Sequence, residues 1–436
     1  MTICKHGEAR ALLHFVFAAV LYLGWVSHGM AAVEDVPIIV PPNNALRPEQ
    51  LGIVINDSDA LSVAIGNYYQ QRRKIPARNV VHLRFSANKN ELSPGEFSVQ
   101  KKLLDNRLPA SVQALALTWA APYRVGCMSI TAAFTFGFDV RYCAHGCVFS
   151  DRSQYAGSNS RAPMDDFQIR PSMMIAARDF ATASALIERG IASDYSQPNG
   201  AAYLLETSDS ARSVRKIFYP QIEREFGDRL SIHSEKSQSL KNASDVMFYF
   251  TGLVDVPDIA SNHFLPGAVA DHLTSYGGQL TDSSQMSALR WLEAGATGSY
   301  GTVVEPCAFV EKFPNPLLFM QHYLAGETLL ESYWKSVYMP GQGVFIGEPL
   351  ARPYGAYRLQ RAHGHWYVSG SALRLGNYQL FAADKIIGPF ERVASSVMVN
   401  PLTRELELPE PTRPFYRLEL VEIPALIFNG SLNKMR

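Results

Sequence analysis

Hydrophobic positions follow two alternating patterns from residue 51 to residue 353. Short, mostly apolar runs predict buried strands at 51–55, 114–119, 201–205 and 246–250, and a further strand is predicted at 80–85. Between these runs, apolar residues recur on one helical face, as they do at 180–189 and after Asn56. Strands that alternate with helices predict an α/β fold with a mostly parallel sheet flanked by helices.

The block 245–353 continues this rhythm, and its loops collect most of the suggestive polar residues. Further strands are predicted at 267–270 and 298–304, and helices at 315–325 and 328–337. Because parallel strands end at one edge of a sheet, ligands and chemistry collect beyond their carboxyl ends. The loops after Phe250, Ala270 and Val304 are therefore expected to converge on one cleft.

Local capping signals place a further helix inside this block. Asp282 and Gln285 have the spacing of a capping box, followed by the apolar residues Met286, Leu289 and Leu292. Gly295 follows at the position expected just past a helical end.

The segment 120–175 breaks the alternation and carries three of the four cysteines that follow residue 30. It predicts a long excursion over one edge or face of the sheet. Cys127, Cys143, Cys147 and Cys307 are an even number, which favours disulfides in an oxidising compartment, with three possible connectivities. The alternative is zinc bound by the run from Cys143 through His145 to Cys147, but zinc sites usually space their cysteines by two residues and need a fourth ligand. We therefore expect disulfides and no metal site.

Residues 356–436 differ from the rest of the chain. Short alternating stretches near 367, 378–381, 396–399 and 416–421 are separated by Gly, Pro and Asn. This pattern predicts a small all-β region of sandwich type, in which nothing indicates chemistry.

The first 32 residues have the order of a secretory signal peptide. Lys5 and Arg10 precede an uncharged stretch at 11–26, and small residues follow up to Ala32. The uncharged stretch is shorter than the ~18 residues that favour a spanning helix. We expect cleavage near Ala32 and a mature protein, periplasmic or secreted, with no membrane segment. The α/β domain then covers 33–355.

Composition limits the classes of partner. Hydrophobic residues make up 47% of the chain and charged residues 18%, which is typical of a folded protein. Lys plus Arg equals Asp plus Glu, at 40 each. A neutral balance argues against nucleic acid or an anionic membrane as the main partner. The glycines at 295, 298 and 301 do not form a dinucleotide fingerprint, because no helix follows them directly, and no cofactor is expected.

Several longer motifs resemble an uncharacterised family of exported bacterial proteins. They are GATGSYGTVVEP at 295–306, YLAGETLLESYWKS at 323–336 and IGEPLARP at 346–353, with LGIVINDSD and RKIPARNV earlier. More distantly, the pattern resembles the gingipain and caspase-like cysteine peptidases. That resemblance implies a caspase-like sheet in which a His-Gly pair follows one core strand and a nucleophilic cysteine ends the next.

This chain departs from the peptidase pattern at both positions. Thr251-Gly252 stands where the resemblance implies His-Gly, and Asp271-His272 stands near the implied nucleophile. The later turn contains Glu348 where those peptidases have an aspartate. A cysteine peptidase needs a thiolate beside a base.

The remaining candidate residues each have an ordinary structural interpretation as well. His263 is a candidate general base or a packing histidine, and Ser275 is a candidate nucleophile or part of a turn. Glu305 is a candidate acid or an internal hydrogen-bond acceptor, and Cys307 is a candidate nucleophile or a disulfide partner. Two hypotheses follow. The first is a binding or scaffold protein without the Cys/His dyad, which recognises an extracytoplasmic protein or glycan. The alternative is a diverged hydrolase or peptidase.

Overall fold

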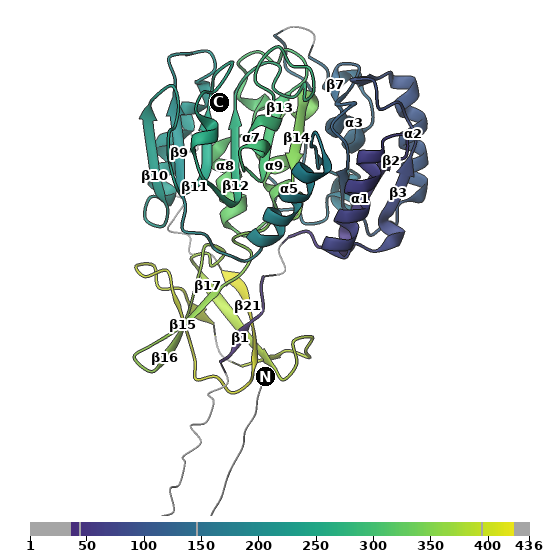
Figure 1. The fold of residues 1–436 in the computed structure, drawn as a ribbon. Coiled ribbons are helices and arrows are strands. Elements are labelled where there is room, and N and C mark those ends of the chain that lie inside the picture. The colour runs from purple at the N-terminus through teal and green to yellow at the C-terminus, as the bar shows by residue number, and fades with distance from the viewer. Residues whose placement is uncertain (1–35, 43–44, 145–146, 394–395, 423–436) are drawn as a thin grey trace, which may run out of the picture. The chain divides into compact units, whose positions relative to one another are not determined.

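The computed structural model describes residues 36–422 apart from 43–44, 145–146 and 394–395. The predicted signal peptide lies outside these residues. Their largest element is a ten-stranded sheet, drawn in Figure 1. Its strands, in spatial order, are β10 (Ser231–Lys236), β9 (Ala201–Glu206), β11 (Val246–Thr251), β12 (Phe264–His272), β13 (Gly298–Thr302), β14 (Gly343–Gly347), β8 (Ser172–Met174), β5 (Ala114–Leu117), β2 (Leu51–Asn56) and β3 (Val80–Leu83).

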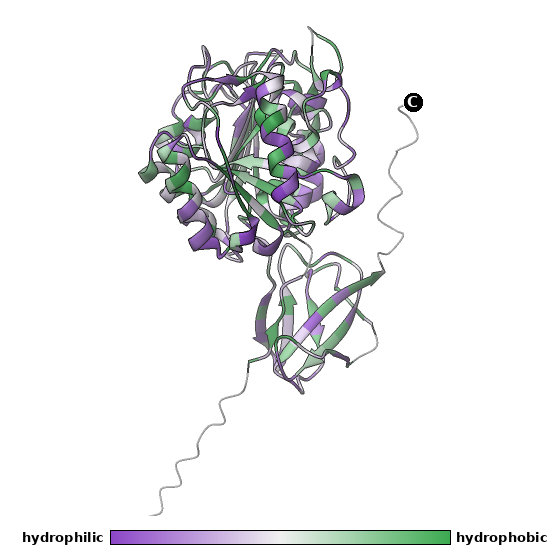
Figure 2. Ribbon diagram, turned by 90° about the vertical axis from the view of Figure 1, so that its right-hand side faces the viewer, coloured by the Kyte–Doolittle hydropathy of each residue, from purple (hydrophilic) through white to green (hydrophobic). Residues whose placement is uncertain are grey.

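Neighbouring strands of this sheet run parallel, except for the antiparallel pair β13–β14. Helices lie on both faces of the sheet, as the edge-on view in Figure 2 makes clear. They are α1 (Ala60–Arg73), α2 (Pro94–Arg107), α3 (Ile130–Phe136), α4 (Pro163–Phe167), α5 (Phe180–Ser193), α6 (Tyr219–Phe226), α7 (Leu289–Glu293), α8 (Pro316–Leu324) and α9 (Leu329–Ser336). The α/β class and the mostly parallel sheet predicted from the sequence are confirmed.

Local sequence signals set the ends of several helices. The Asp59 carboxylate accepts a hydrogen bond from the Leu61 N–H at the start of α1. Lys74 ends that helix in the left-handed conformation. At α9, Thr328 and Glu331 form a complete capping box. Such caps satisfy backbone groups that a helix end would otherwise leave without partners.

One hydrophobic core joins the sheet to its helices. Trp119, Trp291 and Trp334 are completely buried in it. Hydrophobic residues predominate in the central strands, while the helices carry both hydrophobic and hydrophilic residues (Figure 2). In the described residues, no helix is long and apolar enough to cross a membrane.

Two disulfides fasten the excursion at 120–175, which also carries the short strands β6 (Arg124–Val125) and β7 (Met128–Ser129), paired with β4 (Glu91–Leu92). Cys127 is bonded to Cys143 within the excursion. Cys147 is bonded to Cys307, which lies 160 residues further on, just beyond β13. The disulfide prediction is therefore confirmed, and both bridges are typical of proteins that fold in oxidising compartments.

The C-terminal region contains two small sheets that share a hydrophobic core, including Val368, Leu380 and Leu406. This agrees with the predicted all-β region, although β1 joins it from the other end of the chain. One sheet is β15 (Arg358–Ala362), β16 (His365–Ser369) and β20 (Leu406–Leu408). The other is β1 (Ile38–Ile39), β21 (Phe415–Glu422), β17 (Asn377–Ala383), β18 (Glu391–Arg392) and β19 (Val397–Met398).

The strand expected at 267–270 is present and is longer than predicted, because β12 already begins at Phe264 and continues to His272. One other local prediction in the block 245–353 is wrong. The capping box expected at Asp282 and Gln285 does not form, and α7 begins after Ala288 without a side-chain cap. Asp282 accepts a hydrogen bond from the Tyr123 hydroxyl, at 2.6 Å, so tertiary contacts take the place of the local cap.

Candidate functional site

Three of the four candidate residues lie together at the carboxyl edge of the sheet. Ser275, Glu305 and Cys307 line one pocket of about 210 Å³, together with Arg212 and Thr274. The pocket forms because the loops after β12 and β13 meet at this edge, as the parallel topology predicts. The volume is below the 300 Å³ or so that typical small-molecule sites exceed.

The loop that carries Ser275 is pressed against β13. Gly301 of that strand lies against the backbone of Gly277 and Gly278, with no room for a Cβ atom. The Thr302 hydroxyl donates to the Ser275 carbonyl oxygen at 2.9 Å. Glycine therefore occupies both sides of this contact, and strand β13 holds the backbone around Ser275 in place.

Glu305 has a local structural partner. Its Oε1 accepts a hydrogen bond from the Cys307 N–H at 2.8 Å, while the side chain remains exposed. Cys307 adopts φ of +56° and forms the disulfide with Cys147. No histidine is among the described residues that line this pocket, so Ser275 has no imidazole base beside it.

His263 does not face this pocket, which corrects the expectation of a shared site. It precedes β12, and its carbonyl oxygen accepts from the N–H of Val246, the first residue of β11. Both strands begin at that level, so His263 lies at the amino edge. The loop after β11 must cross back to this edge before a parallel strand can start, and His263 is its last residue.

The ends of β11 and β12 are filled by a buried ion pair. Arg215, from the 3-10 turn Val214–Phe218, contacts Asp271 Oδ1 at 2.5 Å. Both side chains are only 1% exposed. Arg215 also donates to the Thr251 carbonyl oxygen at 2.7 Å, so one guanidinium joins the two strand ends.

His272, beside this pair, is held as a neutral imidazole. Its Nδ1 accepts a hydrogen bond from the Trp291 indole N–H at 2.9 Å. The proton therefore resides on Nε2, which donates to the Met286 carbonyl oxygen at 3.2 Å. Burial and the nearby Arg215 guanidinium lower the pKa of His272 to about 3. With both nitrogens engaged and 1% exposure, His272 is not free to accept a proton from a substrate.

Thr251-Gly252 closes the end of β11. Gly252 lies against the backbone carbonyl of Arg212, where a Cβ atom would collide with it. The Thr251 side chain is buried. A glycine is therefore needed here for the close packing of two backbone segments.

The cysteines offer neither a thiolate nor a metal site among the described residues. All four cysteines in that part of the chain are in disulfides. Cys143 and Cys147 have different partners, and His145 of the considered zinc motif lies outside the described residues. No cluster of metal-ligating side chains occurs in the part of the chain that the structure describes.

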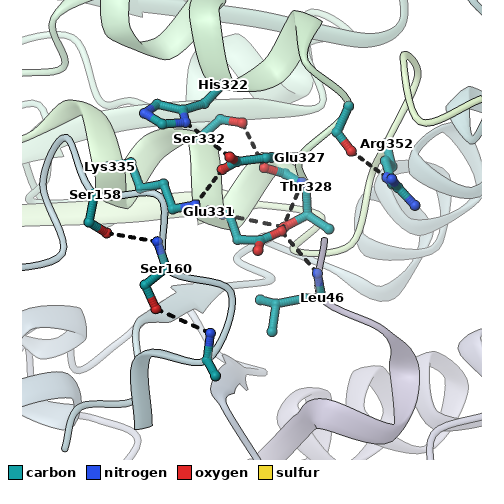
Figure 3. A network of polar contacts seen from close by, with 12 residues as sticks. Leu46, Ser158, Ser160, His322, Glu327, Thr328, Glu331, Ser332, Lys335 and Arg352 are labelled. Carbon is teal, nitrogen blue, oxygen red and sulfur yellow. Dashed lines mark hydrogen bonds and ion pairs between the residues drawn. The ribbon is translucent and has the colours of Figure 1, made fainter. Parts of the chain in front are cut away.

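A second polar network, drawn in Figure 3, connects side chains of α8, of the turn that follows it and of α9, and it was not predicted from the sequence. Lys335 is completely buried and pairs with Glu327 at 2.7 Å. Burial opposes ionisation of Glu327, but the hydrogen bond from His322 and the Lys335 ammonium outweigh it and lower the pKa of Glu327. Glu331 accepts from the N–H of Leu46, and burial raises the pKa of Glu331. These charges hold the segment before β2 onto α9 rather than facing a pocket.

Sequence reasoning also missed Arg215, which lies 56 residues before its partner Asp271. The available signal was Asp271, a charged residue at the end of an apolar strand, because a buried charge requires a partner. Which residue is that partner depends on the tertiary fold and cannot be read from the local sequence.

Comparisons with known proteins add one distant likeness. No family model matches the chain, and no curated protein matches it. Among solved structures, the chain is similar to the Arg-specific cysteine proteinase gingipain R, with a TM-score of 0.41 and 9% sequence identity. The similarity covers 88% of this chain and 94% of that one.

Proposed function

We propose that this chain is an extracytoplasmic binding or scaffold protein that recognises a protein or glycan and lacks peptidase chemistry. One observation carries the proposal. The ends of β11 and β12 are filled by the buried Arg215–Asp271 pair and by a neutral His272 with both nitrogens occupied. A nucleophile and its base need to be accessible and adjacent, and here those strand ends are used for stability.

The disulfides and the signal-like amino terminus support export. Cys147 is exposed, yet it is bonded to Cys307, as expected of a chain that folds where thiols are oxidised. The equal numbers of basic and acidic residues support a protein or glycan partner over nucleic acid.

The alternative function is a diverged hydrolase, and it is favoured by the pocket that brings Ser275 and Glu305 together. In that mechanism, the Ser275 hydroxyl oxygen would attack the carbonyl carbon of an ester or amide while Glu305 takes the hydroxyl proton. Glu305 would then return this proton to the leaving alcohol or amine as the C–O or C–N bond breaks. The hydrogen bond from the Cys307 N–H occupies one of the two Glu305 carboxylate oxygens.

Covalent probes distinguish the two functions. Purified mature protein is treated with a fluorophosphonate for serine nucleophiles and with an epoxide for thiols, and adducts are located by mass spectrometry. The expected result is no stoichiometric labelling of the folded protein. Labelling at Ser275 that is lost in Ser275→Ala and reduced in Glu305→Gln would establish the hydrolase instead. Ser284→Ala, a nearby serine outside this pocket, is the matched control.

A further inference from the structure

A larger pocket, of about 480 Å³, lies at the amino edge of the sheet. Three arginines line it, Arg229, Arg358 and Arg404, and we refer to it as the arginine pocket. Its walls come from the starts of β9 and β10 and from the C-terminal sheets. The described residues from Pro37 onward belong to one compact unit, and this unit contains the whole pocket.

Two of the arginines help to build the walls. Arg404 Nε donates to Asp228 Oδ2 at 2.7 Å, and Arg404 Nη2 lies 2.6 Å from the same oxygen. Arg358 donates to the Gln197 carbonyl oxygen and, at 3.4 Å, to Asn199 Oδ1. Arg358 therefore uses neutral oxygens and has no carboxylate partner among the described residues.

Of the three arginines, Arg229 has the fewest hydrogen-bond and ion-pair partners within the described part of the protein. Its guanidinium lies 5.0 Å from the centre of the Phe226 ring, and it forms no ion pair in the described part of the chain. Partial withdrawal from bulk water in the pocket and the Arg404 guanidinium lower the pKa of Arg229, and they outweigh the opposite effect of the nearby Asp228 and Glu225 carboxylates. The side chain still reaches solvent through the mouth, so its donors are available to a ligand.

The acidic residues of the pocket do not neutralise these cations. Asp228 forms an ion pair with Arg404, and Asp245 accepts a hydrogen bond from the Tyr203 hydroxyl at 2.8 Å. Three guanidinium groups thus face two carboxylates, one of which is already paired. Neutral hydrogen-bonding side chains complete the lining, namely Asn199, Ser231, Ser369, Ser371 and Thr403.

We propose that the arginine pocket binds an oxyanion group, carboxylate, sulfate or phosphate, with Arg229 as its main charged contact. A guanidinium presents a planar set of donors that matches two oxygens of such a group. The surrounding hydroxyls and amides can receive the polar remainder of the ligand. A volume of about 480 Å³ lies within the range of sites for small ligands. The site lies at the opposite edge from the Ser275 pocket, so it is independent of whether the chain has hydrolase activity.

Calorimetric titration of the full mature protein tests this site. Sulfate, phosphate and glucuronate are titrated separately in a chloride buffer of constant ionic strength. We expect saturable binding of at least one probe. Arg229→Gln should weaken it by about tenfold or more, because a charge-assisted hydrogen bond is lost. Arg224→Gln, an exposed arginine of α6 outside the pocket, should bind as the wild type does.

The probes also distinguish the source of the oxyanion. Tighter binding of glucuronate than of sulfate or phosphate identifies an acidic sugar, and the reverse order identifies a compact ion or a sulfated or phosphorylated group. Arg358→Gln, on the facing wall, should weaken the same probe. The proposal is overturned if no probe saturates the wild type, or if Arg229→Gln and Arg224→Gln bind equally well. An active hydrolase that still binds the anion would overturn only the function proposed for the carboxyl edge.

Discussion

Replacing Asp271 by asparagine is the most direct test of the buried ion pair at the strand ends. The substitution keeps the size of the side chain but leaves the Arg215 guanidinium without a counter-charge. Both side chains are 1% exposed, so water cannot compensate Arg215. Breaking a buried pair by removing one partner typically costs about 3 to 5 kcal/mol. Asparagine can still accept one hydrogen bond, so we expect a loss of about 3 kcal/mol in the free energy of unfolding.

A matched surface pair provides the control. Glu293 contacts Arg178 at 2.7 Å, but the two side chains are 30% and 57% exposed. Glu293→Gln should therefore cost ~1 kcal/mol or less. A double variant, Arg215→Met with Asp271→Leu, should recover most of the stability lost in Asp271→Asn, since apolar groups need no counter-charge.

Urea unfolding of the protein, followed by tryptophan fluorescence, measures these differences. Trp291 is a suitable reporter because its indole donates to His272, the residue after Asp271. If Asp271→Asn costs no more than Glu293→Gln, the pair does not stabilise the fold. The ends of β11 and β12 would then have to be reconsidered as a catalytic site.

Two further predictions concern pH and the disulfides. His272 binds a proton near pH 6.5 when unfolded but only near pH 3 when folded, so the unfolded chain binds more protons between these values. The free energy of unfolding should therefore fall by up to about 1.4 kcal/mol per pH unit below pH 6. The His272→Gln variant should lack this contribution to the pH dependence. Equal slopes of unfolding free energy against pH, measured by urea unfolding of both proteins, would refute the prediction. Replacing Cys147 and Cys307 together by serine opens a loop of 160 residues and should cost about 4 to 5 kcal/mol, more than the ~3 kcal/mol expected for the 16-residue bridge. Equal losses for the two serine double variants in denaturant unfolding would contradict the loop-entropy reasoning.

The sequence predicted those parts of the fold whose signals are local. β2, β5, β9 and β11 are almost entirely apolar runs, and β11 is buried at every residue. β10 was missed because its six residues, Ser231–Lys236, are nearly all exposed and carry no apolar pattern. β14 was missed because a five-residue strand between glycines resembles a turn, and its direction depends on pairing with β13.

The candidate site was predicted only in part, because its geometry depends on contacts between residues that are far apart in the sequence. Ser275 and Glu305 share a pocket because parallel topology brings their loops to one edge. His263 was placed at the wrong edge, since the start of β12 determines on which side of the sheet it lies. Arg229 carried no sequence signal, because its significance comes from the other arginines around the pocket.

The parallel pairing of β1 with β21 has a consequence for biosynthesis. Ile38 is the register partner of Phe415, so β1, the first described strand, can pair only after β21, the last one, has been synthesised. Nearly the whole chain must leave the ribosome before this sheet is complete, a contact of very long sequence separation that delays folding. A fragment that begins at residue 356 would lack that edge strand. Conversely, a chain cut short before residue 415 would leave Ile38 and Ile39 without the partner strand that holds them.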